Sequence, residues 1–246
     1  MEEVKKLLLQ EWNLADQYRG VEHWENFNQL YEAREKRLEL MASQVVFIQG
    51  CGSMGSGVIL DNKGNIATNA HVISTGRGLC KQLLVRTVWG YQGQARFVVG
   101  EYEQDIAIIR VVPDDKFVGA EIAPQVFLGQ DVYAIGHPLG KRNTVTRGII
   151  SYPERRVEGR PYVQTDTSIN PGNSGGGLFD ELGRLVGLPT WKEVWADNRR
   201  RVPVANIGFA VPGYVVAEYY KRALQRTVEL ICAGDPHAPM KPVIIS

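Results

Sequence analysis

Between residues 44 and 212, short runs of β-branched, aromatic and other apolar residues are separated by Gly, Asn, Asp and Pro. The runs form two groups of six, one on each side of a connector at 113–128. Many short strands with frequent turns are typical of antiparallel barrels. The pattern therefore predicts an all-β protein with two six-stranded antiparallel β-barrels, the first in 44–112 and the second in 130–212, joined by a linker at 113–129. The expected strands are 44–49, 56–60, 65–69, 82–89, 94–100 and 105–112, and then 130–136, 144–152, 161–165, 177–180, 184–191 and 207–211.

The segments outside the barrels have a different pattern. Residues 2–43 contain no proline and one glycine, Gly20, which separates two helix-like stretches. We expect a helical extension over 1–43 whose aromatic residues cap the core, a partner-binding face being the alternative. The terminal segment 213–246 is expected to form a helix at about 213–231 and a tail. The apolar residues that recur near helical spacing in the second N-terminal stretch are Trp24, Phe27, Tyr31 and Leu38.

Composition limits the partners of the chain. A net charge of +1 gives no global field that would attract nucleic acid. No apolar run reaches the roughly 18 residues that a membrane-spanning helix needs, and the start of the chain is not a secretory signal as written. We expect no nucleic-acid partner and no membrane contact is evident. The compartment stays open: cytoplasmic as written, extracytoplasmic if a signal has been removed.

The three cysteines are an odd and sparse set, without metal-ligand spacing or a disulfide framework. Unpaired cysteine is among the most frequently buried residue types. We therefore expect Cys51, Cys80 and Cys232 to be buried thiols, and we expect no metal site.

The run 170–177, Asn-Pro-Gly-Asn-Ser-Gly-Gly-Gly, places one serine among four glycines and a proline. Such a segment is neither a helix interior nor a central strand. Glycine allows backbone N–H groups to turn toward a common point, which a nucleophilic serine beside an oxyanion hole requires. Ser174 is therefore a candidate nucleophile, the alternative for this run being an exposed surface turn.

Two further polar residues complete a catalytic set. His71 follows a strand-like run and Asp105 begins an apolar one. A neutral imidazole can take the proton of a serine hydroxyl near neutral pH, and a carboxylate can orient that imidazole. The chain order His, Asp, Ser is that of a known serine-protease triad. Because His71 and Asp105 belong to the first strand group and Ser174 to the second, we expect an active-site cleft between the barrels.

Three short segments, 68–72 (Thr-Asn-Ala-His-Val), 105–107 (Asp-Ile-Ala) and 172–176 (Gly-Asn-Ser-Gly-Gly), resemble the active-site motifs of trypsin-like serine proteases of the HtrA/Deg family. The resemblance covers roughly residues 44–218. It implies two β-barrels, endopeptidase activity on polypeptide substrates, and no metal or cofactor. Further stretches that look like family segments are 56–59, 134–136, 164–177 and 207–212.

On this resemblance, His71 is the base, Asp105 orients it and Ser174 is the nucleophile. The amides of Gly172 and Ser174 form the oxyanion hole, with Asn173 between them. HtrA proteins usually carry PDZ domains after the protease, but the printed chain is expected to hold none. Family trimers often use the segment before the first barrel, which here has a helical pattern, so a homo-oligomer stays possible and a trimer in doubt.

The resemblance also places a primary specificity pocket beside the nucleophile. Its expected lining has no charged side chain, and Ser168 occupies the likely floor, whereas an acid would be expected there for Lys or Arg. We therefore expect cleavage after uncharged aliphatic residues, the alternative being that several of these side chains merely pack the second barrel. The expected lining is Ser168, Ile169, Leu188, Pro189, Thr190, Ile207 and Gly208.

Some of these segments also match motifs of other protein classes. Residues 50–55 match the dinucleotide pattern G-x-G-x-x-G, but strand-like residues follow where a helix is needed. Residues 172–176 match the nucleophile elbow of α/β-hydrolases, which would make the chain an esterase with His237 as base. A non-catalytic peptide binder or holdase on the same fold is a further alternative. The polar segment 192–206 is expected to be a solvated loop or a regulatory one.

Overall fold

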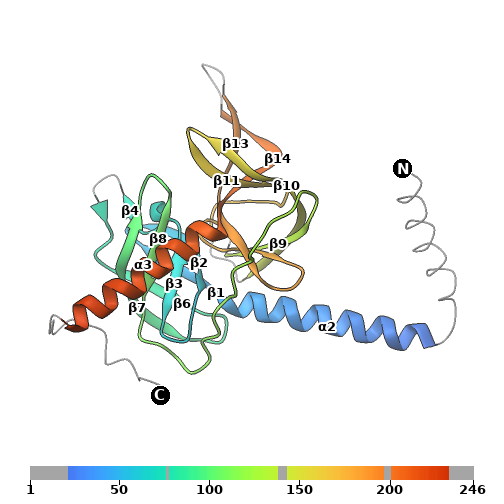
Figure 1. Cartoon of the computed structure of the whole chain (residues 1–246), viewed down its shortest axis with the longest axis horizontal. Helices are drawn as coiled ribbons and strands as arrows, with labels where there is room; N and C mark the ends of the chain where they lie inside the picture. Colours follow the sequence, from blue (N-terminus) through green and yellow to red (C-terminus); the bar gives the residue numbers. More distant parts are fainter. Residues whose placement is uncertain (1–21, 76–77, 138–142, 197–200, 233–246) are drawn as a thin grey trace. The chain divides into compact units, whose positions relative to one another are not determined.

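The computed structural model describes residues 22–75, 78–137, 143–196 and 201–232 (Figure 1). The chain divides into two units, residues 1–39 and 40–246. The second unit contains two closed barrels of six antiparallel strands each, which confirms the predicted fold class.

The first barrel is closed because β6 (Leu83–Arg86), the last strand in ring order, pairs with β1 (Val45–Gly50), the first strand of the ring. Along β1 the side chains alternate, so that Val46 and Ile48 enter the core while Phe47 and Gln49 face outward. Ile66 of β3 is paired with Ile109 of β8, and both are fully buried. The strands in ring order are β1 (Val45–Gly50), β2 (Ser53–Ile59), β3 (Asn65–Thr68), β8 (Ile106–Arg110), β7 (Gln92–Glu101) and β6 (Leu83–Arg86).

The second barrel repeats this design around Val132, Ile150 and Leu178, all fully buried. Its strands β13 and β14 are longer than predicted, because the pairing continues as far as Ala196 and Arg201. The prediction of a loop over 192–206 was therefore wrong for most of that segment, and only 197–200 lie outside the described residues. The strands in ring order are β10 (Thr144–Val157), β11 (Arg160–Thr165), β14 (Arg201–Pro212), β13 (Leu185–Ala196), β12 (Gly177–Asp180) and β9 (Asp131–Gly136).

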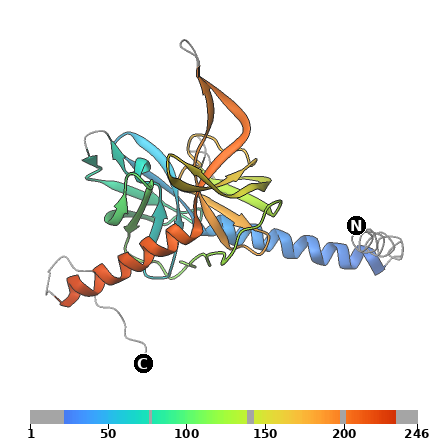
Figure 2. The ribbon, with the colours of Figure 1, turned by 45° about the horizontal axis from the view of Figure 1, so that its top comes forward.

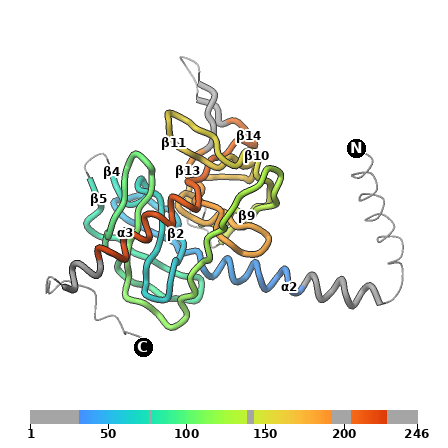
Figure 3. Tube along the Cα trace, viewed as in Figure 1, coloured from blue at the N-terminus to red at the C-terminus, as the bar shows by residue number. Residues whose placement is uncertain are grey.

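The connection from β8 to β9 runs from the first barrel to the second (Figure 3). It is hydrogen-bonded to both. It passes along the first barrel, where Phe117 enters the core and the Ala120 amide donates to the Ile59 carbonyl at 2.9 Å. It then reaches the second barrel, where the Ala123 amide donates to the Leu185 carbonyl at 2.9 Å. The linker thus fixes the two barrels to each other as well as joining them.

The C-terminal helix α3 (Gly213–Cys232) follows β14 and packs across β3, β7 and β8 of the first barrel (Figures 1 and 2). Tyr220 donates its hydroxyl to Asp61 Oδ2 at 2.7 Å, and Tyr219 donates to Glu101. Burial and the neighbouring carboxylate raise the pKa of Tyr219 to about 12, so its hydroxyl stays a donor at neutral pH. The helix therefore ties the end of the second barrel to the first.

The N-terminal helix α2 (Glu22–Gln44) confirms helical structure before the first barrel, and the other predicted helix lies outside the described residues. In its last turn Met41 is buried and Gln44 Nε2 donates to the Gly119 carbonyl at 3.1 Å. Neither α2 nor α3, as far as they are described, has an apolar stretch long enough to cross a bilayer.

The expectation of three thiols was wrong for two of them, because Cys51 and Cys80 form a disulfide with their Cα atoms 5.5 Å apart. Cys51 lies in the turn between β1 and β2, where it and Gly52 both have positive φ (49° and 80°), as a two-residue hairpin turn requires. Ser53 Oγ in this turn donates to the Val72 carbonyl at 3.0 Å, in the short 3₁₀ helix η1 (Ala70–Val72). This packing brings together cysteines separated by 29 residues, which spacing alone did not reveal.

The same turn bears out the rejection of a dinucleotide site at 50–55, because this segment spans the end of β1, the turn and the start of β2. After η1 the chain forms a short two-stranded sheet, β4 (Ser74–Thr75) with β5 (Gly78–Leu79), before Cys80. Strand, turn and strand thus replace the helix that a dinucleotide site needs.

Candidate active site

Pairing between two strands of the first barrel positions the histidine and the aspartate. Thr68 at the end of β3 is opposite Ala107 near the start of β8. Because the strands are antiparallel, the residues that follow β3 and those that precede β8 emerge at the same end of the sheet. His71, on η1, and Asp105, in the turn before β8, are thereby brought side by side.

The His71 imidazole and the Asp105 carboxylate form a closely bonded pair. His71 Nδ1 lies 2.9 Å from Oδ2 and 3.0 Å from Oδ1, and the His71 backbone amide donates to Oδ1 at 3.1 Å. Asp105 has φ of 51°, an uncommon conformation for a residue with a side chain. Asn69 Nδ2 donates to the Asp105 carbonyl at 2.8 Å and so helps to hold it. The ring nitrogen that faces away from Asp105 is left for other partners.

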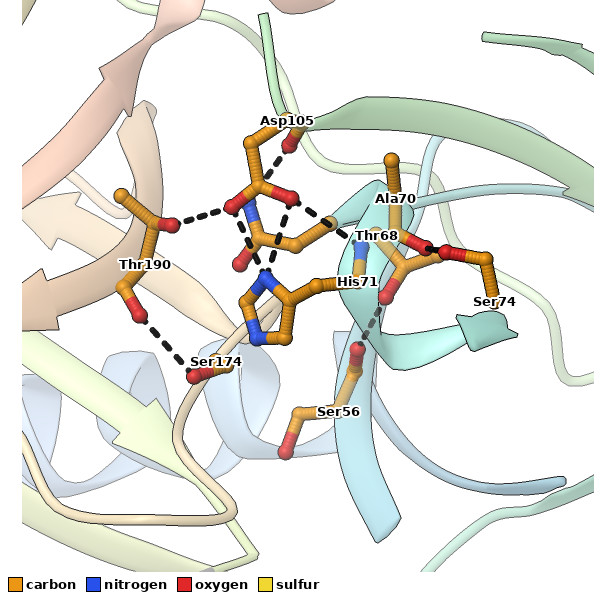
Figure 4. A network of polar contacts seen from close by, with 9 residues as sticks. Ser56, Thr68, Ala70, His71, Ser74, Asp105, Ser174 and Thr190 are labelled. Carbon is orange, nitrogen blue, oxygen red and sulfur yellow. Dashed lines mark hydrogen bonds and ion pairs between the residues drawn. The ribbon is translucent and has the colours of Figure 1, made fainter. Parts of the chain in front are cut away.

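Ser174 comes from the second barrel and lies on the other side of the imidazole from Asp105 (Figure 4). Its hydroxyl donates to the Thr190 carbonyl on β13 at 3.1 Å. Thr190 also donates its own hydroxyl to Asp105 Oδ2. Thr190 was predicted only as a pocket residue, yet it contacts both ends of the candidate triad, a role that its place in the sequence did not signal.

Ser174 lies in the segment 170–177, which we name the nucleophile loop after its candidate nucleophile. The glycines around Ser174 let this loop pack closely against the first barrel. Gly175 has φ of 78°, and a Cβ at this position would lie 2.3 Å from the Ser56 carbonyl oxygen. The Gly175 amide donates to the Pro189 carbonyl and the Asn173 amide to the Asn170 carbonyl, both at 2.9 Å. Among the described residues the amides of Gly172 and Ser174 donate to no backbone carbonyl.

Ser56 on β2 holds the nucleophile loop from the side of the first barrel. Its amide donates to the Ser174 carbonyl at 2.9 Å, and its hydroxyl donates to the Gly172 carbonyl at 2.7 Å. The Ser56 hydroxyl in turn accepts the His137 amide at 3.0 Å, and His137 Nδ1 lies 3.4 Å away. Neither Ser56 nor His137 was among the predicted site residues, and no sequence motif marks the connection between them.

The predicted pocket residues differ in exposure. Ser168 is exposed, and its carbonyl accepts Thr146 Oγ1 at 3.3 Å and Asn173 Nδ2 at 3.4 Å. Ile169 is buried against β14, since a Cβ on Gly208 would lie 2.5 Å from its Cδ1. Leu188 is fully buried. The remaining predicted residues are Pro189, which is buried, Thr190 and Ile207.

The first element after Ser174 is the strand β12, not a helix. A nucleophile elbow requires a strand-to-helix turn, so the α/β-hydrolase alternative is wrong. Its histidine, His237, lies outside the described residues.

The arrangement resembles that of known proteases. The family model described as "Trypsin-like peptidase domain" matches residues 55–188. Protease Do-like 1, chloroplastic, of Arabidopsis thaliana is 34% identical over 168 residues, which cover 64% of this chain and 36% of that protein. Serine endoprotease DegS of Escherichia coli is 36% identical over 168 residues, which cover 65% of this chain and 45% of that protein.

Solved structures agree with these sequence comparisons. The serine endoprotease from Yersinia pestis superimposes with a TM-score of 0.65 at 30% identity, covering 78% of this chain and 66% of that one. The HtrA-type protease AlgW, solved with a tripeptide, gives a TM-score of 0.66 at 29% identity, with coverages of 76% and 62%. The chain therefore belongs to the trypsin-like peptidases, as a serine protease domain of the HtrA type. It spans less than half the length of the two curated relatives.

His137 makes the fold sensitive to acid. Burial lowers its pKa from 6.5 to about 4, so the unfolded chain takes up a proton at a higher pH than the folded chain. Stability is then expected to fall as the pH drops from about 6.5 through about 4, by about 3 kcal/mol in total. Thermal unfolding across this range should show a shallower decline for His137→Asn than for the unsubstituted protein. Parallel curves would contradict the assignment.

Proposed function

We propose that this chain is an endopeptidase that cleaves polypeptides with His71 as base, Asp105 as its orienting carboxylate and Ser174 as nucleophile. The observation that carries the proposal is the His71–Asp105 pair at 2.9 Å, with the Ser174 side chain on the opposite side of the ring (Figure 4). A carboxylate at Nδ1 favours the tautomer whose Nε2 can accept a proton, and stabilises the imidazolium that forms.

In the proposed reaction the Ser174 hydroxyl first turns from the Thr190 carbonyl toward His71 Nε2. Oγ attacks the carbonyl carbon of the peptide bond while its proton passes to Nε2, which gives a tetrahedral intermediate. His71 then donates this proton to the leaving amine, and the C–N bond breaks. A water molecule, deprotonated by the same imidazole, hydrolyses the acyl-enzyme and restores Ser174.

The oxyanion of the intermediate is proposed to bind the amides of Gly172 and Ser174, on either side of Asn173. Two observations support this assignment. These amides donate to no backbone carbonyl among the described residues, and Gly172 has φ of 101°, which directs its peptide groups in a way that a residue with a side chain rarely allows. The Ser56 hydroxyl, bonded to the Gly172 carbonyl at 2.7 Å, favours one orientation of that peptide unit. Preorganised donors of this kind are usually a large term in acyl transfer.

A covalent probe tests the triad. A fluorophosphonate is expected to label the protein, and Ser174→Ala to abolish labelling, because the probe needs the serine oxygen as nucleophile. Hydrolysis of an unfolded protein such as casein should fall by about 10⁶-fold in Ser174→Ala and His71→Ala.

Ser151→Ala, which alters a serine on β10 outside the site, is the matched control and should retain both labelling and hydrolysis. Labelling that persists in Ser174→Ala would refute the assignment of the nucleophile. Peptide binding by the unsubstituted protein without any labelling or turnover, even after unfolded protein is added, would instead support the non-catalytic binder.

Thr190 is proposed to position Asp105 through its hydroxyl. Thr190→Val keeps the volume and the backbone carbonyl but removes the donor to the carboxylate, so kcat is expected to drop about tenfold with little change in KM. Thr190→Ser restores a hydroxyl and should recover most of kcat. Equal losses in both variants would point to packing and contradict a role of the hydroxyl.

The substrate preference is proposed to be for uncharged, small or medium aliphatic residues before the cleaved bond. The side chains expected to line the pocket are uncharged, and Ile169 fills space beside Gly208. Cleavage of a peptide library followed by mass spectrometry should give Val, Ala, Ile or Leu as the main residues at that position. A profile dominated by Lys or Arg would overturn the proposal.

A further inference from the structure

A cavity of 590 Å³ opens on the first barrel, where the outward face of β1 and β2 meets the turn between β6 and β7. Phe47 and Met54 line it from β1 and β2, Arg86 from the end of β6, Tyr91 from the turn after β6, and His137 from the position that follows β9. None of the predicted pocket residues lines this cavity, so it is separate from the proposed specificity pocket.

One end of the cavity adjoins the nucleophile loop. Met54 is 51% exposed, and the next residue, Gly55, is packed so that a Cβ there would lie 3.2 Å from the Ser174 carbonyl oxygen. His137, at another wall, bonds to the Ser56 hydroxyl, which bonds to the Gly172 carbonyl. Two lining residues of the cavity, Met54 and His137, are thus connected to the segment that holds Ser174 through Gly55 and Ser56.

The cavity lies on a definite side of the catalytic serine. The Ser174 hydroxyl faces Thr190 on β13, on the side of the proposed specificity pocket (Figure 4). Its backbone carbonyl accepts the Ser56 amide of β2, on the side of the cavity. If the residue before the cleaved bond enters the proposed pocket, the residues after the bond extend to the opposite side of Ser174, toward β2 and the cavity beside it.

The lining combines apolar and aromatic side chains with neutral polar ones and a single charged group. The Phe47 ring packs edge-on against the His137 ring at 5.8 Å, and Tyr91 is fixed by its hydroxyl, which donates to the Val112 carbonyl at 2.6 Å. Burial lowers the pKa of His137, so this ring is neutral near pH 7. Arg86 is then the charged group of the lining, and its Nε donates to Gln92 Oε1 at 3.1 Å.

We propose that this cavity binds the part of the substrate that follows the cleaved bond, and that it selects an apolar side chain against Phe47 and Met54 together with an acidic one near Arg86. The inference rests on the proposed endopeptidase function and adds a preference on the leaving side of the bond. A guanidinium favours carboxylate partners because its N–H groups can form charge-assisted hydrogen bonds with both oxygens.

The test uses pairs of peptides that are identical up to the cleaved bond and carry Glu or Gln at the second, third or fourth residue after it. For at least one position, kcat/KM is expected to be about two- to fivefold higher for Glu, the range of an exposed ion pair, and the difference should shrink at high salt. Arg86→Gln should abolish the preference and Arg86→Glu should reverse it in favour of Lys.

Two controls separate this proposal from general damage. A short chromogenic amide with no residue after the cleaved bond should be hydrolysed equally by the unsubstituted protein and both Arg86 variants. Arg226→Gln, which removes an exposed arginine on α3, should leave the Glu preference intact. An unchanged Glu-to-Gln ratio in Arg86→Gln, or an equal loss on the short substrate, would overturn the proposal.

A binding measurement distinguishes failure of this inference from failure of the proposed function. Fluorescein-labelled Glu and Gln peptides are titrated against Ser174→Ala, which cannot cleave them, and anisotropy is recorded. A Glu preference that disappears in Ser174→Ala combined with Arg86→Gln supports the cavity even if no hydrolysis is found. Equal binding of the two peptides contradicts it, whatever the activity of the unsubstituted protein.

Discussion

The Asp105 carboxylate is the point on which the geometry of the site depends, because it is bonded from both barrels. His71 of the first barrel donates to it from Nδ1 and from its backbone amide, and Thr190 of the second barrel donates its hydroxyl. A carboxylate that accepts several donors is fixed in orientation as well as position. Because Thr190 belongs to the second barrel, the full set of donors to the Asp105 carboxylate is assembled only when the barrels are docked.

The other connections between the barrels serve the same requirement. The linker bonds to Ile59 and then to Leu185, and α3 returns from the second barrel to the carboxylates of Asp61 and Glu101. Ser56 acts nearest the chemistry, since it ties β2 to the loop that carries Ser174. Each of these contacts opposes separation of the two halves on which catalysis would depend.

The sequence was most informative where function and local structure place the same demand on neighbouring residues. The strand-like runs predicted both barrels, since alternating apolar residues and turn formers reflect a period of two. The candidate triad could be chosen because His71, Asp105 and Ser174 each occur in a short distinctive segment. Ser56 and Gly172 are 116 residues apart, and no local pattern marks contacts across such a separation. The hairpin of β13 and β14 was missed because its charged residues are typical of loops, while backbone pairing tolerates them.

The Cys51–Cys80 bridge joins the hairpin turn beside Met54 to the segment after His71. Disulfides persist in oxidising compartments and are kept reduced in the cytosol. In the first setting the β1–β2 turn, a rim beside the proposed substrate cavity, is covalently tethered to the segment that follows η1. In the second, the same rim is held by the hydrogen bonds from Ser53 to Val72 and from the Cys80 amide to Ile73. The stiffness of the proposed leaving-group side thus depends on the redox state of its surroundings, whereas the hydrogen bonds of the His71–Asp105 pair do not involve the cysteines.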